Sequence, residues 1–491
     1  MLLQSLLRPV LTPLMRGMFD APIFSSSAWS PLALWPDGIA TPGMWISPRT
    51  LTSEWKDYTG TTPVVTPGTV ADSSNPVGLA LDIRTGAPEV LGPNVLPNGT
   101  FDTNVDNWGS VSPGATISWD AGTALLNSTT AGVKTTSYSA PILTIGKTYE
   151  IRFTVTATNA AGGNAFIGWG SGNYYRGGDR VGLETKIIVV AAGTSLVMRV
   201  DGVAYANFDN ISAREVPGLH MFQSTDVDRP LLSARVNLLV GTATLSTQNV
   251  TVTAIPHTIT FSGGGTVTAS GTYVGALTSG QTFTPTAGTL TLTVSGSVTS
   301  AMLNRGSVAL TYQPAVSASS YTATGFPTYQ QYNGTNSSMA TVAFSAGTLT
   351  SAMDCMIAVR RGSAASCVAG LYNGIADATK FFGMAESASG SGCVGSGAGT
   401  PTVWVDNTQL TGGTAVTRGT LHTALTVGDW HILEFRNLDL STWTAAGFGL
   451  YTSYVFPGPR GDILLYPSTA STEDKDAARQ YLADYYGVTL P

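Results

Sequence analysis

The sequence predicts an all-β protein, built as β-sandwiches in series with a kinked N-terminal helix and one C-terminal helix. Three observations predict this class. Thr, Val and Ser are abundant, with 56 Gly and 26 Pro among the 491 residues, and these residues favour short pleated strands closed by tight turns. Apolar and polar residues alternate with a period of two through much of the chain after residue 93, as in half-buried antiparallel strands. Only 11% of residues are charged although 43% are hydrophobic. Such a chain either buries much of its surface in an assembly or uses hydroxyl and amide groups as its polar surface, and the Thr-rich strands favour the second.

Residues 1–29 contain a segment whose Leu and Met residues recur at helical spacing. Pro9 and Pro13 predict a kink or break, because each removes a backbone donor. Such a helix cannot bury its apolar face alone, so we expect residues 1–29 to anchor the protein to sister subunits or to a larger particle. The alternative is a helix folded onto its own domain. Arg8 and Arg16 interrupt the apolar run, which predicts no membrane span and no secretion signal, hence synthesis in a bacterial cytoplasm.

Residues 30–92 are rich in Pro and Gly and predict an irregular connector, pinned by Trp35, Trp45 and Trp55. Part of this stretch resembles the N-proximal region of many bacteriophage tail-fibre and virion proteins. The resemblance spans about 35 residues and is carried by Met44, Trp45, Asp57, Thr61, Thr62, Pro63, Pro76, Val77 and Gly78. It implies a protein of the virion surface, in which residues 1–29 contact other virion proteins and a binding domain follows the connector.

Residues 93–217 predict a separate β-sandwich, with alternating stretches such as KTYEIRFTVTAT and TSLVMRV between turn residues. The segment opens with Asn98–Phe101, continues through Trp108 and closes with Phe208–Ile211. These residues resemble the opening and closing strands of jelly-roll carbohydrate-binding modules, over about 125 residues. The resemblance implies a sugar-binding jelly roll, with a structural calcium ion near the closing strand.

Residues 218–313 are Thr- and Gly-rich, nearly uncharged, and predict a spacer β-sandwich. They are similar to a module of phage head-spike and tail-fibre proteins. Residues 314–491 resemble concanavalin/laminin-G-like lectin sandwiches, which implies a lectin-like domain, although an obvious acidic calcium loop is missing. The residues that carry this second match are Trp430, His431, Gly461, Ile463, Leu465, Tyr466, Tyr481, Leu482, Tyr486, Gly487 and Pro491.

The C-terminal helix is predicted by signals at both of its ends. Ser471 or Thr472 can cap its N-terminus, acidic residues follow in the first turn, and Gly487 can end it. Its expected apolar face contains Ala478, Tyr481, Leu482 and Tyr485.

Charge and cysteine content narrow the functional classes. The net charge is −6 without a basic block, which argues against a nucleic-acid partner. Cys355, Cys367 and Cys393 fit no zinc spacing, and we expect them to be small buried apolar residues; one disulfide with a free thiol is the alternative. Low charge and Thr-rich strands favour a homo-oligomer, and the resembling phage fibres imply a trimer.

Sugar binding is the activity that the sequence favours most, because aromatic faces stack on sugar rings. Trp169, Tyr174, Tyr175 and Arg176 lie within one glycine-flanked stretch and are the candidate carbohydrate-binding residues. The alternative places Trp169 in the core and the tyrosines at a subunit contact. Asp209, in the closing strand, is the candidate ligand of the implied calcium ion; no other cofactor is expected.

Catalysis is not expected. The four histidines match no ligand or nucleophile spacing, and the sparse acids lie where turn-capping Asp is common. The function predicted is therefore a phage tail-fibre or baseplate-associated protein that attaches to host-surface glycans by weak multivalent binding. Two alternatives remain: a head fibre or capsid spike that decorates the shell, and a polysaccharide depolymerase with two opposed carboxylates.

Overall fold

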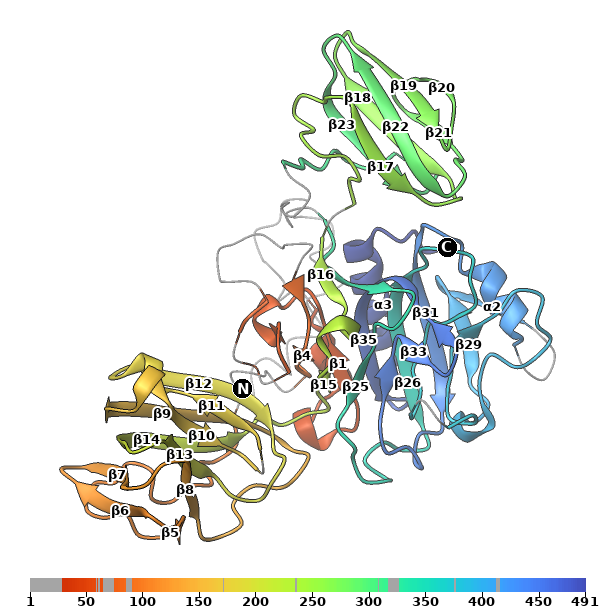
Figure 1. Cartoon of the computed structure of the whole chain (residues 1–491). Helices are drawn as coiled ribbons and strands as arrows, with labels where there is room; N and C mark the ends of the chain where they lie inside the picture. Colours follow the sequence, from red (N-terminus) through yellow and green to blue (C-terminus); the bar gives the residue numbers. More distant parts are fainter. Residues whose placement is uncertain are drawn as a thin grey trace, which may run out of the picture.

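The structure is a computed structural model. It describes residues 29–58, 60, 62–64, 75–84, 91–170, 172–234, 236–307, 309–316, 326–374, 377–411 and 416–491. The helix expected over residues 1–29 lies outside these ranges, apart from Trp29. The described chain is all-β, with its strands gathered in three bodies (Figure 1). None of its described helices combines the length and the apolar character needed to cross a bilayer.

Two antiparallel sheets form a body that we call the central sandwich. Its larger sheet, counted over the described residues, runs β3-β16-β24-β35-β26-β31-β29-β30, and β1 also pairs with β35. These strands are β1 (Met44–Ile46), β3 (Asn75–Pro76), β16 (Leu231–Ser233), β24 (Tyr329–Asn333), β26 (Met353–Arg360), β29 (Thr402–Val405), β30 (Thr408–Gln409), β31 (Trp430–Leu438) and β35 (Pro457–Pro467). Segments far apart in the chain therefore build one sheet.

The second sheet of the central sandwich runs β2-β4-β15-β25-β32. Its strands are β2 (Glu54–Trp55), β4 (Leu79–Ala80), β15 (Met221–Phe222), β25 (Met339–Thr341) and β32 (Gly447–Phe448). Two strand pairs complete the body: β27 (Cys367–Val368) with β28 (Met384–Ala385), and β33 (Leu450–Tyr451) with β34 (Tyr454–Val455). The chain also contains short 3-10 helices at Pro31–Leu34, Gly38–Ala40, Leu51–Ser53, Ala161–Gly163, Gly178–Arg180, Asp226–Asp228 and Ser396–Ala398.

The expectation of an irregular connector over residues 30–92 is wrong. This stretch contributes β1, β3 and β4, which pair with strands from the rest of the central sandwich, and β2, which pairs with β4. Trp35, Trp45 and Trp55 are buried, and Trp35 Nε1 donates to the carbonyl of Leu465, 430 residues further along the chain. Strands of two or three residues carry no periodic pattern, so their distant partners are what define them.

A sandwich of two five-stranded sheets is inserted between β4 and β15, and we call it the first insert (residues 91–216). One sheet runs β11-β10-β13-β8-β5 and the other β12-β9-β14-β7-β6. The strands are β5 (Trp108–Val111), β6 (Ala115–Asp120), β7 (Thr123–Ser128), β8 (Val133–Tyr138), β9 (Thr148–Thr158), β10 (Ala165–Gly168), β11 (Tyr174–Arg176), β12 (Glu184–Val190), β13 (Val197–Asp201) and β14 (Tyr205–Glu215). The two ends of the insert meet where the Gly92 N–H donates to the Glu215 carbonyl at 2.9 Å.

A buried polar network fastens the ends of the first insert to the central sandwich. The Asp82 carboxylate pairs with Arg84 Nε at 2.8 Å and accepts the Leu219 N–H at 2.9 Å. The Asp82 N–H donates to Nδ1 of His220, so Nε2 carries the ring proton and donates to the Val216 carbonyl. Burial lowers the pKa of His220, which favours this neutral tautomer. The network joins the residues where the chain leaves and re-enters the central sandwich.

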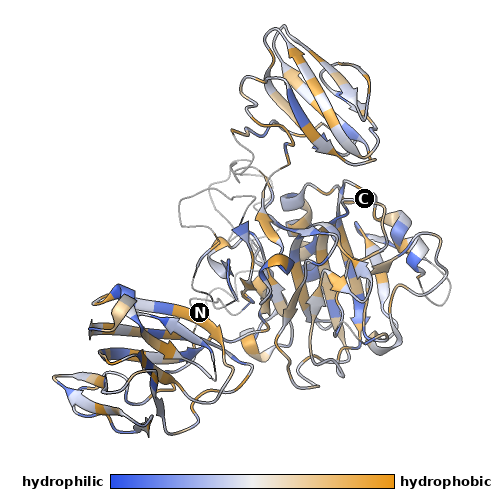
Figure 2. Cartoon of the chain, viewed as in Figure 1, coloured by the Kyte–Doolittle hydropathy of each residue, from blue (hydrophilic) through white to orange (hydrophobic). Residues whose placement is uncertain are grey.

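The second insert (residues 236–316) is a smaller sandwich between β16 and β24. Its sheets run β17-β22-β19-β20 and β21-β18-β23, and Figure 2 shows hydrophobic and hydrophilic residues interleaved along its strands. The strands are β17 (Gln248–Val252), β18 (His257–Ser262), β19 (Thr266–Gly271), β20 (Gly275–Leu277), β21 (Gln281–Phe283), β22 (Gly288–Ser295) and β23 (Thr299–Arg305). The expected start of the spacer at residue 218 is corrected, because β15 and β16 belong to the central sandwich.

The expected C-terminal helix is confirmed as α3 (Thr472–Tyr486). Ser471 Oγ accepts the Asp474 N–H at 3.0 Å, and Gly487 ends the helix in the left-handed conformation with φ of 70°. Its expected face packs on the central sandwich through Ala478, Tyr481, Leu482 and Tyr485. A second, short helix, α2 (Arg418–Ala424), was not expected from the sequence.

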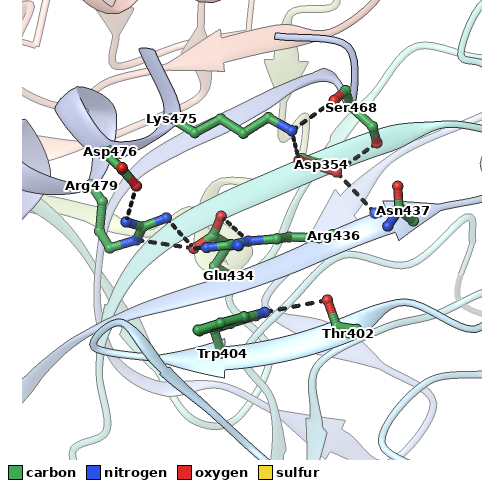
Figure 3. A network of polar contacts seen from close by, with 10 residues as sticks. All are labelled: Asp354, Thr402, Trp404, Glu434, Arg436, Asn437, Ser468, Lys475, Asp476 and Arg479. Atoms are coloured by element: carbon green, nitrogen blue, oxygen red, sulfur yellow. Dashed lines mark hydrogen bonds and ion pairs between the residues drawn. The ribbon is translucent and has the colours of Figure 1, made fainter. Parts of the chain in front are cut away.

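Buried ion pairs hold α3 against the larger sheet (Figure 3). Glu434 of β31 is almost fully buried and accepts hydrogen bonds from Arg436 Nε at 2.8 Å and Arg479 Nε at 3.1 Å. Lys475 of α3 pairs with Asp354 of β26 at 2.8 Å. Each of these buried carboxylates is thus matched by cations, which offsets the cost of removing its charge from water.

Another buried carboxylate, Glu54 of β2, has weaker partners. Gln330 Nε2 donates to Glu54 Oε1 at 2.6 Å, and the Oε1 of Gln330 accepts from Arg460 and from the Tyr332 hydroxyl. Glu54 Oε2 has no hydrogen-bond partner among the residues that the structure describes. Burial raises the pKa of Glu54 to about 7, although the Gln330 amide and the Arg460 charge act in the opposite direction. The group is therefore poised to titrate near neutrality.

The cysteine expectation is confirmed. Cys355, Cys367 and Cys393 are free and buried, and all three lie in the central sandwich. Burial raises the pKa of each thiol, which makes them unreactive while the fold is closed.

Candidate functional site

The four predicted sugar-binding residues lie in the β10–β11 hairpin of the first insert, Trp169 directly after β10 and the other three in β11, but the structure does not present them together. Trp169 is 3% exposed and belongs to the hydrophobic core. Tyr175 packs on that core with its ring edge-to-face against Phe153 at 6.5 Å. Arg176 is half-exposed and pairs with Asp179 at 2.8 Å. Trp169 therefore lies in the core, as the alternative interpretation expected, and sugar binding by the other three residues stays a prediction.

Tyr174 is the predicted aromatic residue that lies on the outer face of its sheet. It pairs across the strands with Gly168, where a Cβ atom would stand 2.6 Å from the tyrosine ring. The ring therefore lies against the backbone of β10. The Arg199 guanidinium lies 4.7 Å from the Phe166 ring and 4.8 Å from the Tyr174 ring, and so occupies the space beside both aromatic faces.

A more open site lies on the other sheet of the first insert. A hollow of about 370 Å³ forms there over β6, β7, β9 and β14, and its walls are Asp120, Leu125, Asn127, Ala157, Tyr205 and Asn207. The alternate residues of β7 and β14 face the core, with Leu126 and Phe208 fully buried. Strand alternation therefore directs the wall residues to the outer surface. We call this hollow the Tyr205 site.

Hydrogen bonds hold the polar floor of the Tyr205 site in place. Asn207 is only 6% exposed, and its Nδ2 donates to Asp120 Oδ2 and to Thr123 Oγ1, both at 2.8 Å. This orients the amide while Tyr205, which is 36% exposed and directly opposite Asn127 on β7, stands at the wall. One aromatic face beside fixed amide and carboxylate groups is the combination that binds a sugar ring, through stacking and hydroxyl hydrogen bonds.

The sequence already held a signal for this site, although the prediction missed it. The sequence predicts a closing strand at Phe208–Ile211, but the aromatic and polar residues just before it, Tyr205 and Asn207, were not assigned to a face. The strand contains irregularities between Asn207 and Phe208 and between Asp209 and Ser212, which shift the alternation along its length. The partner register of β14 with β7 and β9 is what brings Tyr205 and Asn207 to the wall and floor of one hollow.

Asp209, the calcium candidate, lies just beyond this site. Its carboxylate accepts the backbone N–H of Asn210 at 2.7 Å and the Asn210 side-chain amide at 3.0 Å. Burial and the charge of the nearby Asp102 raise the pKa of Asp209. Within the described ranges no three His, Cys, Asp or Glu side chains gather around one point. A cation bound here would be coordinated by the carboxylates of Asp209 and Asp102. Calcium binding stays a prediction.

One hydrogen-bonded row in the central sandwich has the residue types of a hydrolytic triad. His431 Nδ1 lies 2.6 Å from Asp406 Oδ2, and His431 Nε2 lies 2.8 Å from Thr426 Oγ1. The same Thr426 hydroxyl is 3.0 Å from a carboxylate oxygen of Asp429. Asp406 also accepts the Ile432 N–H at 2.8 Å, so the row ties the β29–β30 turn to β31. We interpret it as a structural contact.

The chain matches no protein-family model and no curated protein. Among solved structures it is similar to the N-terminal CBM22-1-CBM22-2 tandem domain from Paenibacillus barcinonensis Xyn10C. That match has 11% sequence identity and a TM-score of 0.20, and covers 77% of this chain and 98% of that chain. A similarity at this TM-score gives no support to a shared site, so the all-β architecture rests on the sheets described above.

Proposed function

We propose that the chain is a structural adhesion protein of a bacteriophage surface, which binds glycans at the Tyr205 site and catalyses no reaction. The observation that carries glycan binding is the hollow itself, with a half-exposed tyrosine beside an amide fixed by Asp120 and Thr123. The virion assignment is supported by the sequence resemblances of residues 30–92 and 218–313. A tail fibre that attaches to host glycans fits these resemblances, and a head fibre is the alternative docking site.

The proposal includes a homotrimer anchored through residues 1–29. Several copies of one weak site on a particle bind a glycan-coated surface far more tightly than one copy does. Light scattering coupled to size exclusion measures the subunit number directly. A cryo-EM map of the assembled particle would show whether the protein docks on the tail or on the head.

Two tyrosine variants test the site. A glycan array identifies the neutral oligosaccharide that binds best, and calorimetry then measures its affinity for wild type, Tyr205→Ala and Tyr174→Ala. Tyr174 is the matched control, because it is a partly buried tyrosine on the opposite sheet of the same insert. We expect Tyr205→Ala to weaken binding about tenfold, from the loss of about 1.4 kcal/mol of stacking, and Tyr174→Ala to leave it unchanged.

The reverse pattern, with loss only in Tyr174→Ala, would place binding on the Phe166–Arg199 face instead. If both variants bind the oligosaccharide as tightly as wild type does, the first insert is rejected as the binding module. Circular dichroism melting of each variant shows whether a lost affinity comes from a lost fold.

The absence of catalysis is tested separately. Purified protein is incubated with the polysaccharide of the best array ligand, and new reducing ends are counted; acetyl release is measured in parallel. We expect neither signal above buffer. A signal that disappears in Thr426→Ala or His431→Gln would show that the Asp406 row is a reaction centre and would overturn this part of the proposal.

A further inference from the structure

A second hollow lies where the second insert meets the central sandwich. Its volume is about 500 Å³, and strands β16, β17, β23, β24 and β26 supply its walls. Two arginines, Arg305 at the end of β23 and Arg360 at the end of β26, line it together with Tyr329. The described wall residues include no aspartate and no glutamate. We call this hollow the arginine cleft.

The two arginines lack the partners that buried arginines normally have. Arg360 is 7% exposed, and its guanidinium makes no hydrogen bond or ion pair with any described residue; it lies 5.5 Å from the rings of Tyr329 and Trp430. Arg305 likewise makes no ion pair within the described ranges, and its Nε is buried without a hydrogen-bond partner. Buried charges are almost always paired, because an isolated charge in the interior is costly. This pair therefore needs an explanation.

Other buried arginines of the described chain have polar partners: Arg361 donates to backbone carbonyls and Arg460 to the Gln330 amide oxygen, and two more pair with carboxylates. Arg84 pairs with Asp82 at 2.8 Å, and Arg479 pairs with Glu434 at 3.0 Å. By contrast, burial and the neighbouring positive charge of Arg360 both lower the pKa of Arg305. Two like charges held together in a cleft attract an anion strongly, because the anion removes their repulsion and satisfies their open N–H groups.

We propose that the arginine cleft binds an acidic sugar, with its carboxylate or sulfate group between Arg305 and Arg360. The remaining walls suit the neutral part of such a ligand, since Tyr329 offers a ring face and Asn249 and Thr251 offer amide and hydroxyl groups. The inference deepens the proposed glycan adhesion and adds a second site, on another face of the chain, with a different ligand charge.

The test uses the full chain and three probes: trigalacturonate, its methyl ester and inorganic phosphate. The ester keeps the size and the hydroxyls of the trisaccharide but removes its charge, and phosphate supplies the charge without a sugar. Affinities are measured for wild type, Arg305→Gln and Arg360→Gln. Arg180→Gln is the matched control, because Arg180 is an exposed arginine of the first insert and its loss changes the net charge equally.

We expect trigalacturonate to bind wild type and Arg180→Gln alike. Each cleft variant should weaken it about tenfold or more, the cost of losing charge-assisted hydrogen bonds. The ester and phosphate should each bind at least tenfold more weakly than trigalacturonate, and affinity should fall as sodium chloride is raised. Arg305→Gln should melt no lower than wild type, since it removes a partly buried charge that has no carboxylate partner among the described residues. If it fails to fold, Arg305→Lys keeps the charge, loses the guanidinium fork and should still weaken binding.

Three results would overturn the inference. Unchanged trigalacturonate affinity in a variant that combines Arg305→Gln and Arg360→Gln would exclude the cleft. Phosphate binding as tight as that of trigalacturonate would identify a site for a free anion. Dissociation of the oligomer in either cleft variant would show that a carboxylate of a second copy fills the cleft. The Tyr205→Ala variant separates the two sites, because it should lose only the neutral glycan; its failure would reject the Tyr205 site and leave the arginine cleft standing.

Discussion

Replacing Glu54 by Gln should remove a pH dependence from the stability of the central sandwich. The folded protein holds the Glu54 proton up to a pKa of about 7, whereas the unfolded chain releases it near 4.5. The stability that this proton contributes is therefore complete below pH 4.5 and is lost as the pH rises towards 7. Gln keeps the size and the hydrogen-bonding amide contact to Gln330 but stays neutral at every pH.

The expected magnitude follows from the two pKa values. Their difference corresponds to about 3 kcal/mol between the protonated and ionised states of the folded protein. Wild type and Glu54→Gln should therefore have similar free energies of unfolding at pH 4.5. At pH 8 the variant should be the more stable by up to about 3 kcal/mol, a figure in which the attraction of Arg460 for the ionised group is already included.

Thiol labelling measures the stability of the central sandwich alone, because Cys355, Cys367 and Cys393 are all buried there and are the only cysteines of the chain. The labelling rate reports the fraction of molecules in which the sandwich is open. Comparing the variant with wild type at the same pH cancels the pH dependence of the thiols. Glu184→Gln, at an exposed site of the first insert, is the control. Equal labelling of wild type and Glu54→Gln at both pH values would refute the buried-proton reasoning.

Three further changes have defined outcomes. Ser471→Ala should cost about 1 kcal/mol, because it removes the N-cap of α3; urea unfolding measures it, and Ser471→Asp should restore the loss. Gly168→Ala should lower the melting temperature of the first insert by a few degrees, since its methyl group displaces the Tyr174 ring; an unchanged melting temperature would contradict the close contact. Millimolar calcium should raise the melting temperature of the first insert in wild type but not in Asp209→Asn, and an equal response in both would exclude Asp209 as a ligand.

Local signals were the reliable part of the sequence prediction. The α3 helix begins after Ser471 and ends before Gly487 because its capping groups lie within a few residues of the backbone that they satisfy. The strands of the two inserts likewise show apolar/polar alternation between turn residues, and each pairs within its own insert, so alternation and turns predict that they are strands. Such features need no knowledge of the rest of the chain.

The sequence prediction was wrong where strands pair with partners far away in the chain. The sequence predicts a connector over residues 30–92 because its strands are two or three residues long and the partners of β1, β3 and β4 lie in β35, β16 and β15. The first insert shows the same limit at smaller scale, since Trp169 turns inward whereas Tyr205 turns outward. Arg305 and Arg360 stand on different bodies, and only their folded positions bring them into one cleft.

The nesting of two modules inside the central sandwich constrains the order in which the chain can mature on the ribosome. Both inserts are complete, and able to close, before the last strands of the central sandwich are translated. By contrast, the hydrogen bond of Trp35 to Leu465 cannot form until a further 430 residues have been synthesised. At bacterial and eukaryotic elongation speeds this is a delay of roughly 20 to 90 s. Through that interval the early apolar strands have no partner, so a polypeptide released before β35 would expose them to aggregation or degradation. The central sandwich can therefore fold completely only after the whole chain has been synthesised.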